Sequence, residues 1–171
     1  DLFEKYGENL IDDLNHLELI GDLYNRREEW GNSLAYYSKL EHISIELKNR
    51  LNLGRIYSKI GRIYRKIGEW NNSLEYLLKS EQIETEIGDR QGLGHTNINI
   101  GFLYYNKGEL DKALEYFFKD EQISLEVGNL NLLSWSYSGI GAIYSKKNDW
   151  DNALEYYLKS NKICLETGDL K

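Results

Sequence analysis

The sequence predicts an all-α protein built from four consecutive helical hairpins. One nine-residue stretch recurs four times at a constant spacing of 40 residues: WGNSLAYYS at 30–38, WNNSLEYLL at 70–78, LDKALEYFF at 110–118 and WDNALEYYL at 150–158. A fixed period of this size is typical of arrays that stack one supersecondary unit on the next. The chain contains no proline and no low-complexity linker. We therefore expect a single domain over 1–171, with repeats at 11–50, 51–90, 91–130 and 131–170.

The second repeat shows how the first helix of each hairpin is encoded. Its apolar residues recur every three or four positions, which predicts one buried helical stripe; they are Leu53, Ile56, Ile60, Ile63 and Ile67. Gly68 follows and can adopt a positive φ, so we expect the helix to end there.

The second helix of the same repeat begins at the recurring stretch. We expect Asn71 and Asn72 to cap its N-terminus, because their side chains can accept hydrogen bonds from free backbone N–H groups. Its apolar face comprises Leu74, Leu77, Leu78 and Ile83. Gly88 ends this helix, and the third and fourth repeats carry the same terminators at Gly108, Gly128, Asn148 and Gly168. Three i,i+4 pairs, Glu75–Lys79, Glu115–Lys119 and Glu155–Lys159, predict a solvated outer face.

The start of the chain does not form a complete repeat. Residues 1–10 resemble the end of the other units, so they are either a remnant of a preceding repeat or a frayed terminus. The chain begins at Asp1 and contains no methionine, from which we expect a fragment of a longer polypeptide.

Composition excludes several classes of partner. The formal net charge is −7, which argues against general affinity for nucleic acid or an anionic membrane, since phosphate binding needs a basic surface. No apolar run approaches the roughly 20 residues of a membrane span. The single cysteine, Cys164, leaves no internal disulfide and fits a reducing compartment. We expect a cytoplasmic protein.

The repeats resemble the tetratricopeptide repeat (TPR), whose pattern is W-x2-L-G-x2-Y followed by A-x3-F. The first half matches at Tyr57, Ile60, Gly61 and Tyr64, and again at Tyr137, Ile140, Gly141 and Tyr144. The second half matches at Ala113 and Phe117, at Ala153 and Tyr157, and with serine at Ser33 and Ser73. The period of 40 instead of about 34 and the missing proline depart from the pattern. Longer repeats of this kind are similar to those of kinesin light chains, Pins-type modulators and bacterial Rap-type regulators.

The resemblance implies a right-handed α-α superhelix, a TPR solenoid of four helix-turn-helix repeats plus an N-terminal partial element. In that family the first helices line a concave groove that binds peptides or helices. The residues support close packing independently. Gly21, Gly61, Gly101 and Gly141 lie within predicted helices, where glycine costs about 1 kcal/mol relative to alanine. Close approach of the second helix, opposite Ser33, Ser73, Ala113 and Ala153, would offset this cost.

One stripe on the first helices contains the candidate binding residues. In the second repeat it is basic, whereas in the third and fourth repeats it is polar and aromatic. The predicted groove residues are Arg55, Lys59, Arg62, Lys66, His95, Asn99, Phe102, Tyr105, Asn106 and Trp135. We expect this groove to bind a protein or peptide with acidic and aromatic or aliphatic anchors.

Two other interpretations of the stripe remain open. The basic residues can form a solvated face that is balanced by acids such as Glu18 and Asp22, with the aromatic residues closing gaps between repeats. Alternatively, an anion such as phosphate can bind between Arg55 and Lys66.

Other functional classes have less support in the sequence. No catalytic motif is present, and His16, His42 and His95 occupy different repeat positions, so we expect no enzyme, metal or cofactor. Two functions beside peptide binding remain open. The chain can be a regulatory or sensor segment of a larger signalling protein. It can also self-associate end to end, because Leu158 and Ile163 in the last helix lack a following repeat.

Overall fold

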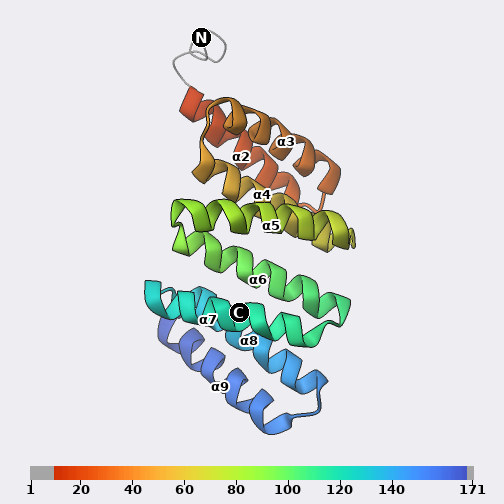
Figure 1. Ribbon diagram of the computed structural model, residues 1–171, viewed down its shortest axis with the longest axis vertical. Coiled ribbons are helices and arrows are strands. Elements are labelled where there is room, and N and C mark those ends of the chain that lie inside the picture. The colour runs from red at the N-terminus through yellow and green to blue at the C-terminus, as the bar shows by residue number, and fades with distance from the viewer. Residues whose placement is uncertain (1–9, 169–171) are drawn as a thin grey trace. The chain divides into compact units, whose positions relative to one another are not determined.

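The computed structural model describes residues 10–168, with side chains from residue 14 onward. In this part of the chain all regular structure is helical, which confirms the predicted all-α class (Figure 1). The possible repeat remnant at 1–10 lies outside the described residues apart from Leu10, where the first helix begins. No helix in the described part is both long enough and apolar enough to cross a bilayer.

The chain divides into two compact units, 1–87 and 88–171, and each contains two hairpins. The first unit comprises α2 (Leu10–Arg26), α3 (Trp30–Glu46), α4 (Arg50–Lys66) and α5 (Trp70–Ile87). The second comprises α6 (Arg90–Lys107), α7 (Leu110–Val127), α8 (Leu130–Lys146) and α9 (Trp150–Thr167). The single domain over 1–171 stays a prediction.

The helices end at the predicted residues, but one predicted helix cap is wrong. Gly68 and Gly108 have φ of +84° and +80°, as expected of residues that end a helix in the left-handed region. The expected cap at Asn71 and Asn72 is wrong, because α5 already begins at Trp70. Side-chain caps precede three first helices, where Asn49, Asp89 and Asn129 accept bonds from the Asn52, Gly92 and Leu132 N–H groups. Asp149 caps the second helix α9 in the same way.

The two helices of each hairpin approach closely at the glycine within the first helix. A Cβ added at Gly61 would lie 2.7 Å from Leu77 Cγ, and one at Gly101 would lie 2.9 Å from Phe117 Cε1. The close approach is therefore to the large residue four positions after the predicted small one. In the first unit the predicted small residues are Ser33 and Ser73. Their hydroxyls donate hydrogen bonds to the Gly21 and Gly61 carbonyls at 2.8 Å.

A stacked tyrosine pair joins the helices of every hairpin. The pairs are Tyr24–Tyr36, Tyr64–Tyr76, Tyr104–Tyr116 and Tyr144–Tyr156, with ring centroids 5.6–5.8 Å apart. A lysine lies over the second ring of each pair, for example Lys119 over Tyr116 at 4.3 Å. The three predicted Glu–Lys pairs are confirmed, with N–O distances of 2.6–2.8 Å. The outer face thus places lysine ammonium groups over aromatic rings.

The core consists of one apolar cluster in each unit. In the first unit Tyr37, Leu40, Ile56, Ile60 and Ile63 are buried together. The second unit has an equivalent cluster around Phe117, with Ile98, Ala113, Leu132, Ile140 and Ile143.

The last helix only partly matches its prediction. Leu158 is exposed, but so are the corresponding Leu78 and Phe118, which have a following repeat, and Ile163 is buried. The corresponding residues Ile83 and Ile123 pack near Gly54 and Gly94, in the first helix of their own hairpins. Ile163 therefore does not depend on a further repeat.

A buried carboxylate interrupts the apolar packing of the second unit. Asp120 is fully buried and accepts hydrogen bonds from Ser124 at 3.1 Å and from Ser136 at 2.6 Å. Burial raises the pKa of Asp120 to about 6, and the two hydroxyl bonds offset only part of that effect. The corresponding residues of the second and fourth repeats are Ser80 and Ser160, so packing does not require a charge there.

We expect Gly61→Ala to lower the free energy of unfolding by about 1–3 kcal/mol, because the added methyl overlaps Leu77. Gly31→Ala is the matched control, since a Cβ at Gly31 meets nothing within 4 Å. Urea denaturation measures both. Equal or greater stability of Gly61→Ala would contradict the close approach.

The charge of Asp120 predicts a pH dependence of stability. The folded-state pKa lies above the ordinary value of 3.8, so the folded protein binds the Asp120 proton more tightly than the unfolded chain does. The stability that this proton contributes is present at acid pH and is lost as pH rises through 6. The loss amounts to about 3 kcal/mol by neutral pH. We expect Asp120→Asn and Asp120→Ser to gain stability relative to wild type between pH 4 and 8. Urea unfolding across that range tests this, and a constant difference would contradict it.

Candidate functional site

In the first unit, an ion-pair network that includes the predicted residue Lys59 joins α2 to α4. Lys59 Nζ lies 2.6 Å from Glu18 Oε1 and 2.8 Å from Asp22 Oδ2. The Tyr37 hydroxyl donates to Asp22 Oδ1 at 2.5 Å. Lys59 is therefore paired with Glu18 and Asp22, the two acids that could balance the basic residues in the solvated-face interpretation. Its role in binding stays a prediction.

The network changes the titration of its members. Burial would raise the pKa of Asp22, but hydrogen bonds from Lys59 and Tyr37 outweigh it and the pKa is lowered. Burial and the bond to Asp22 raise the pKa of Tyr37 far above its usual range. Asp22 is thus ionised and neutralised by Lys59.

A pocket of about 410 Å³ lies beside this network. Its lining residues are Asp22, Asn25, Arg26, Glu28, Lys59, Arg62 and Lys66. Two buried polar atoms, Asn25 Oδ1 and Arg62 Nε, have no hydrogen-bond partner in the structure. Buried polar atoms are nearly always bonded, so these two atoms are unusual among the residues that line the pocket.

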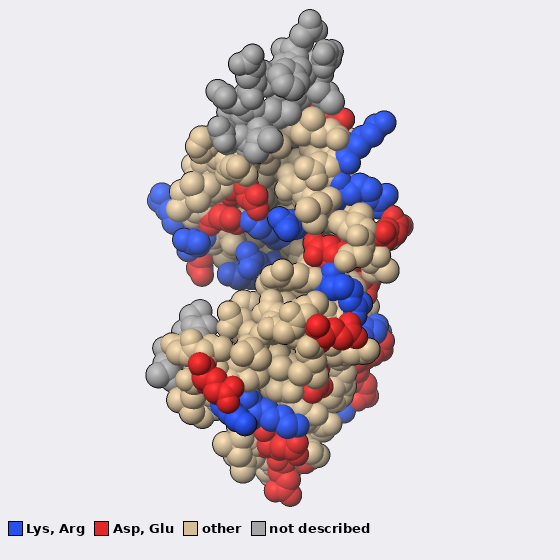
Figure 2. Space-filling view, turned by 90° about the vertical axis from the view of Figure 1, so that its left-hand side faces the viewer, with Lys and Arg blue, Asp and Glu red and all other residues tan. Residues whose placement is uncertain are grey.

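Cations exceed anions around the pocket once the internal pair is removed. Lys59 is committed to Asp22 and Glu18, which leaves Arg26, Arg62 and Lys66 against Glu28. Burial and the neighbouring Arg62 charge lower the pKa of Arg65, because two guanidinium groups repel one another. Figure 2 shows Lys and Arg side chains mixed with acids over the first unit.

Two predicted basic residues are exposed, and only Lys66 of the two lines the pocket. Arg55 is exposed and does not line the pocket. Lys66 is exposed, with its Nζ 4.9 Å from the centroid of the Trp30 ring.

In the second unit the predicted residues lie on α6 and α8, and they differ in exposure. Phe102 is half-buried and meets Phe117 edge to face, with ring centroids 5.0 Å apart. Tyr105 is half-buried, and Lys146 Nζ lies 4.0 Å above its ring, which places α6 and α8 side by side on this face. Trp135 is 50% exposed. Of the remaining three, His95 and Asn106 are exposed and Asn99 is half-buried.

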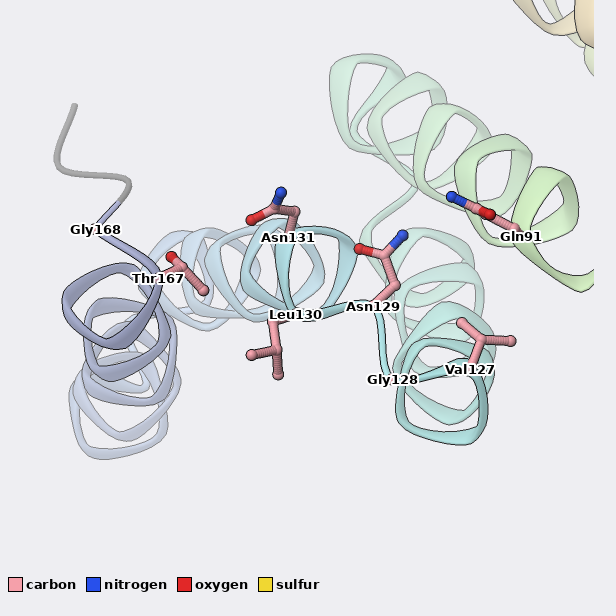
Figure 3. Close-up of a pocket in the computed structure, with 8 residues that line it drawn as sticks. All are labelled: Gln91, Val127, Gly128, Asn129, Leu130, Asn131, Thr167 and Gly168. Atoms are coloured by element: carbon pink, nitrogen blue, oxygen red, sulfur yellow. The ribbon is translucent and has the colours of Figure 1, made fainter.

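A larger pocket, of about 620 Å³, contains none of the predicted residues (Figure 3). It lies at helix ends of the second unit, lined by Gln91, Val127, Gly128, Asn129, Leu130, Asn131, Thr167 and Gly168. The Asn129 side chain already caps α8 through the Leu132 N–H. The sequence gives no sign of this hollow, because each residue serves as an ordinary helix terminus.

Asn25, Arg26 and Glu28 line the pocket but are not among the predicted groove residues, and of these Asn25 is buried. It occupies the repeat position of Arg65 and Tyr105, so the repeat register could have identified it as lying alongside the stripe. Its burial could not have been predicted, because that depends on the packing of α2 against α3 and α4.

No cluster of three or more His, Cys, Asp or Glu side chains suited to a metal occurs among residues 10–168.

Similar folds are found among solved structures at low sequence identity. A Rap protein complexed with Competence and Sporulation Factor has a TM-score of 0.88 at 19% identity, covering 96% of this chain and 46% of that one. Aspartyl phosphate phosphatase F from Bacillus subtilis has 0.87 at 20%, covering 94% and 42%. A signal transduction ATPase with a tetratricopeptide repeat sensor, from Pyrococcus horikoshii, has 0.82 at 18%, covering 93% and 24%. The chain thus spans less than half of each of these proteins.

Comparison with curated proteins finds no match. A family model for the tetratricopeptide repeat matches residues 52–117 and 92–166, which together span most of the chain. The chain belongs to the tetratricopeptide repeat family.

Proposed function

We propose that this chain is a protein-interaction domain that binds an acidic segment of a partner, anchored in the pocket between α2 and α4. The observation that carries the proposal is the pair of unpartnered buried atoms, Asn25 Oδ1 and Arg62 Nε, in one pocket. A buried polar atom without a partner costs about 1–3 kcal/mol. A ligand that satisfies both atoms recovers this cost on binding.

The chemistry of the two atoms defines the ligand. Arg62 Nε carries a hydrogen and needs an acceptor, for which a carboxylate is the strongest choice. Asn25 Oδ1 needs a donor, which a peptide backbone N–H supplies. An Asp or Glu within an extended segment offers both groups close together. Because the chain as a whole has a net charge of −7, the excess of cations around this pocket is opposite in sign to the charge of the protein.

Aromatic residues of the second unit supply a separate contact. Trp135 exposes half of its surface, and tryptophan is enriched among residues that dominate binding energy. Beside α8, Phe102 and Tyr105 give α6 an aromatic surface. We infer that this surface takes an aromatic or aliphatic side chain of a partner, while His95, Asn99 and Asn106 offer polar contacts along the same helix.

The comparisons add support of a general kind. One similar structure is that of a Rap protein complexed with Competence and Sporulation Factor, so at least one protein that contains this fold forms a complex with a factor.

We expect Arg62→Glu to weaken binding of acidic peptides at least tenfold, because a charged hydrogen bond worth about 1.5–3 kcal/mol is replaced by repulsion. Asn25→Ala should weaken it less, since it removes only one neutral bond. Fluorescence polarisation against a peptide library with varied acidic and aromatic positions gives the measurement.

Lys159→Glu is the matched control, because it makes the same charge change on the outer face. Equal effects of Arg62→Glu and Lys159→Glu would contradict the assignment. Preferential binding of inorganic phosphate or a DNA oligonucleotide, lost in Arg62→Glu, would instead favour an anion site.

A second candidate function is regulation within a longer signalling protein. One similar structure contains a tetratricopeptide repeat sensor in a signal transduction ATPase. The division of this chain into two compact units is consistent with such a role. The full-length gene tests it, since an adjoining ATPase, kinase or DNA-binding domain would favour regulation.

A further inference from the structure

A carboxyl group occupies a position at which two other hairpins have a serine. In the second repeat the Ser80 hydroxyl donates to the Gly54 carbonyl at 2.7 Å, and in the fourth repeat the Ser160 hydroxyl donates to the Ser134 carbonyl at 3.0 Å. Each of these bonds joins the second helix of a hairpin to its first helix. The corresponding residue of the third repeat is Asp120 on α7, which is fully buried.

The corresponding carbonyl of the third repeat is that of Gly94 on α6, and the Asp120 carboxyl lies against this residue. A Cβ added at Gly94 would be only 2.7 Å from Asp120 Oδ1. Asp120 Oδ2 accepts a hydrogen bond from the Ser136 hydroxyl of α8 at 2.6 Å, and the Ser124 hydroxyl lies 3.1 Å from both oxygens. Oδ2 therefore bonds to α8, whereas Oδ1 is the oxygen beside α6.

The protonation state of Asp120 decides whether Oδ1 can bond to α6. A carboxylate oxygen only accepts hydrogen bonds, whereas a protonated carboxyl group has one O–H donor. A backbone carbonyl is an acceptor with two lone pairs, so it can take a second hydrogen bond beside the one within its helix. Only the protonated form of Asp120 can therefore donate as Ser80 and Ser160 do in their hairpins.

The surroundings of Asp120 favour the proton. Burial raises the pKa of Asp120 to about 6, the two serine hydroxyls oppose that effect, and the charge of the neighbouring Glu121 on α7 adds to it. On α6 and α8 the residues against the carboxyl group, Gly94 and Ser136, are uncharged. The titratable residue next to Gly94 is His95, which is exposed. A buried carboxylate with such neighbours lacks the compensation that a nearby cation would give.

We propose that Asp120 is a pH-sensitive switch: its protonated carboxyl group donates from Oδ1 to the Gly94 carbonyl and thereby bonds α7 to α6, and its ionisation breaks that bond. The proton leaves to solvent, and the remaining carboxylate needs water that the closed packing excludes. The contacts of α7 are therefore tight at acid pH and loosen locally as the pH rises, in a chain that stays folded.

The switch adjoins the candidate binding residues of the second unit. Gly94 immediately precedes His95 on α6, and Ser136 immediately follows Trp135 on α8. The helices α6, α7 and α8 all contact one another, so loosening at Asp120 changes how firmly α6 and α8 are held. This change takes place with or without a bound partner, and the inference is thus independent of the proposed function.

Carboxyl carbon-13 NMR of aspartate-labelled protein tests the first step, with the Asp120 signal assigned by its loss in Asp120→Ser. We expect a titration midpoint of about 6 in wild type. Ser136→Ala should move the midpoint to higher pH, because it removes a hydrogen bond that favours the charged form. A midpoint near the ordinary value of 3.8 would overturn the proposal.

Hydrogen exchange across the same pH range tests the second step. Exchange of α6 and α7 amides should rise above the intrinsic increase with pH, with the midpoint of the carboxyl titration. Asp120→Ser should remove this extra rise, since serine is the neutral donor that two other hairpins use. A carboxyl group that titrates near pH 6 without a change in exchange would overturn the proposal, because the proton would then control nothing.

Trp135 fluorescence reports whether the change reaches α8. The other three tryptophans share one repeat position, which the third repeat fills with Leu110, so each can be replaced by leucine: Trp30, Trp70 and Trp150. We expect the emission of Trp135 to shift with the same midpoint, and the shift to be absent when Asp120→Ser is added. A shift that persists in Asp120→Ser but disappears in His95→Asn would assign the transition to the histidine and contradict the switch.

Discussion

The close approach of paired helices at glycine is the constraint on which each hairpin depends. Leu77 and Phe117 occupy space that a Cβ on Gly61 or Gly101 would fill. Glycine within a helix costs about 1 kcal/mol, and packing of a large side chain against the bare backbone offsets it. This approach brings the stacked tyrosines within reach of one another and leaves the other side of the first helix free for polar residues.

The polar groups that remain inside the repeats fall into three cases. Lys59 joins two carboxylates of α2 to α4 and so contributes to the packing of neighbouring first helices. Asp120 has only hydroxyl partners in the contacts described above and is destabilising when ionised. The pocket atoms of Asn25 and Arg62 form a third case, in which buried polarity is unmatched within the chain. Buried polar atoms are nearly always bonded, which is why the proposed function rests on these two.

The repeat register carried most of the correct predictions. It gave the all-α class, the hairpins, the Glu–Lys pairs and the glycine terminators, because these depend on neighbours within a few residues. The cap prediction at Asn71 was wrong because the helix begins one residue earlier. The prediction for Ile163 was wrong because the direction of its side chain depends on packing. The stacked tyrosines were missed even though they recur every 40 residues, because nothing local indicates which rings of two helices meet.

The sequence by itself determined the 40-residue period and the positions at which helices begin, end and approach their hairpin partners. These follow from the conformational freedom of the backbone and from the spacing of apolar residues. Only the tertiary structure decided which cations of the basic stripe are engaged. Lys59 finds Glu18 and Asp22 on another helix, whereas Arg62 retains an unpartnered nitrogen in a pocket beside them. Residues about 40 positions apart meet only when two helices pack, so the charge available to a partner is a property of the folded chain.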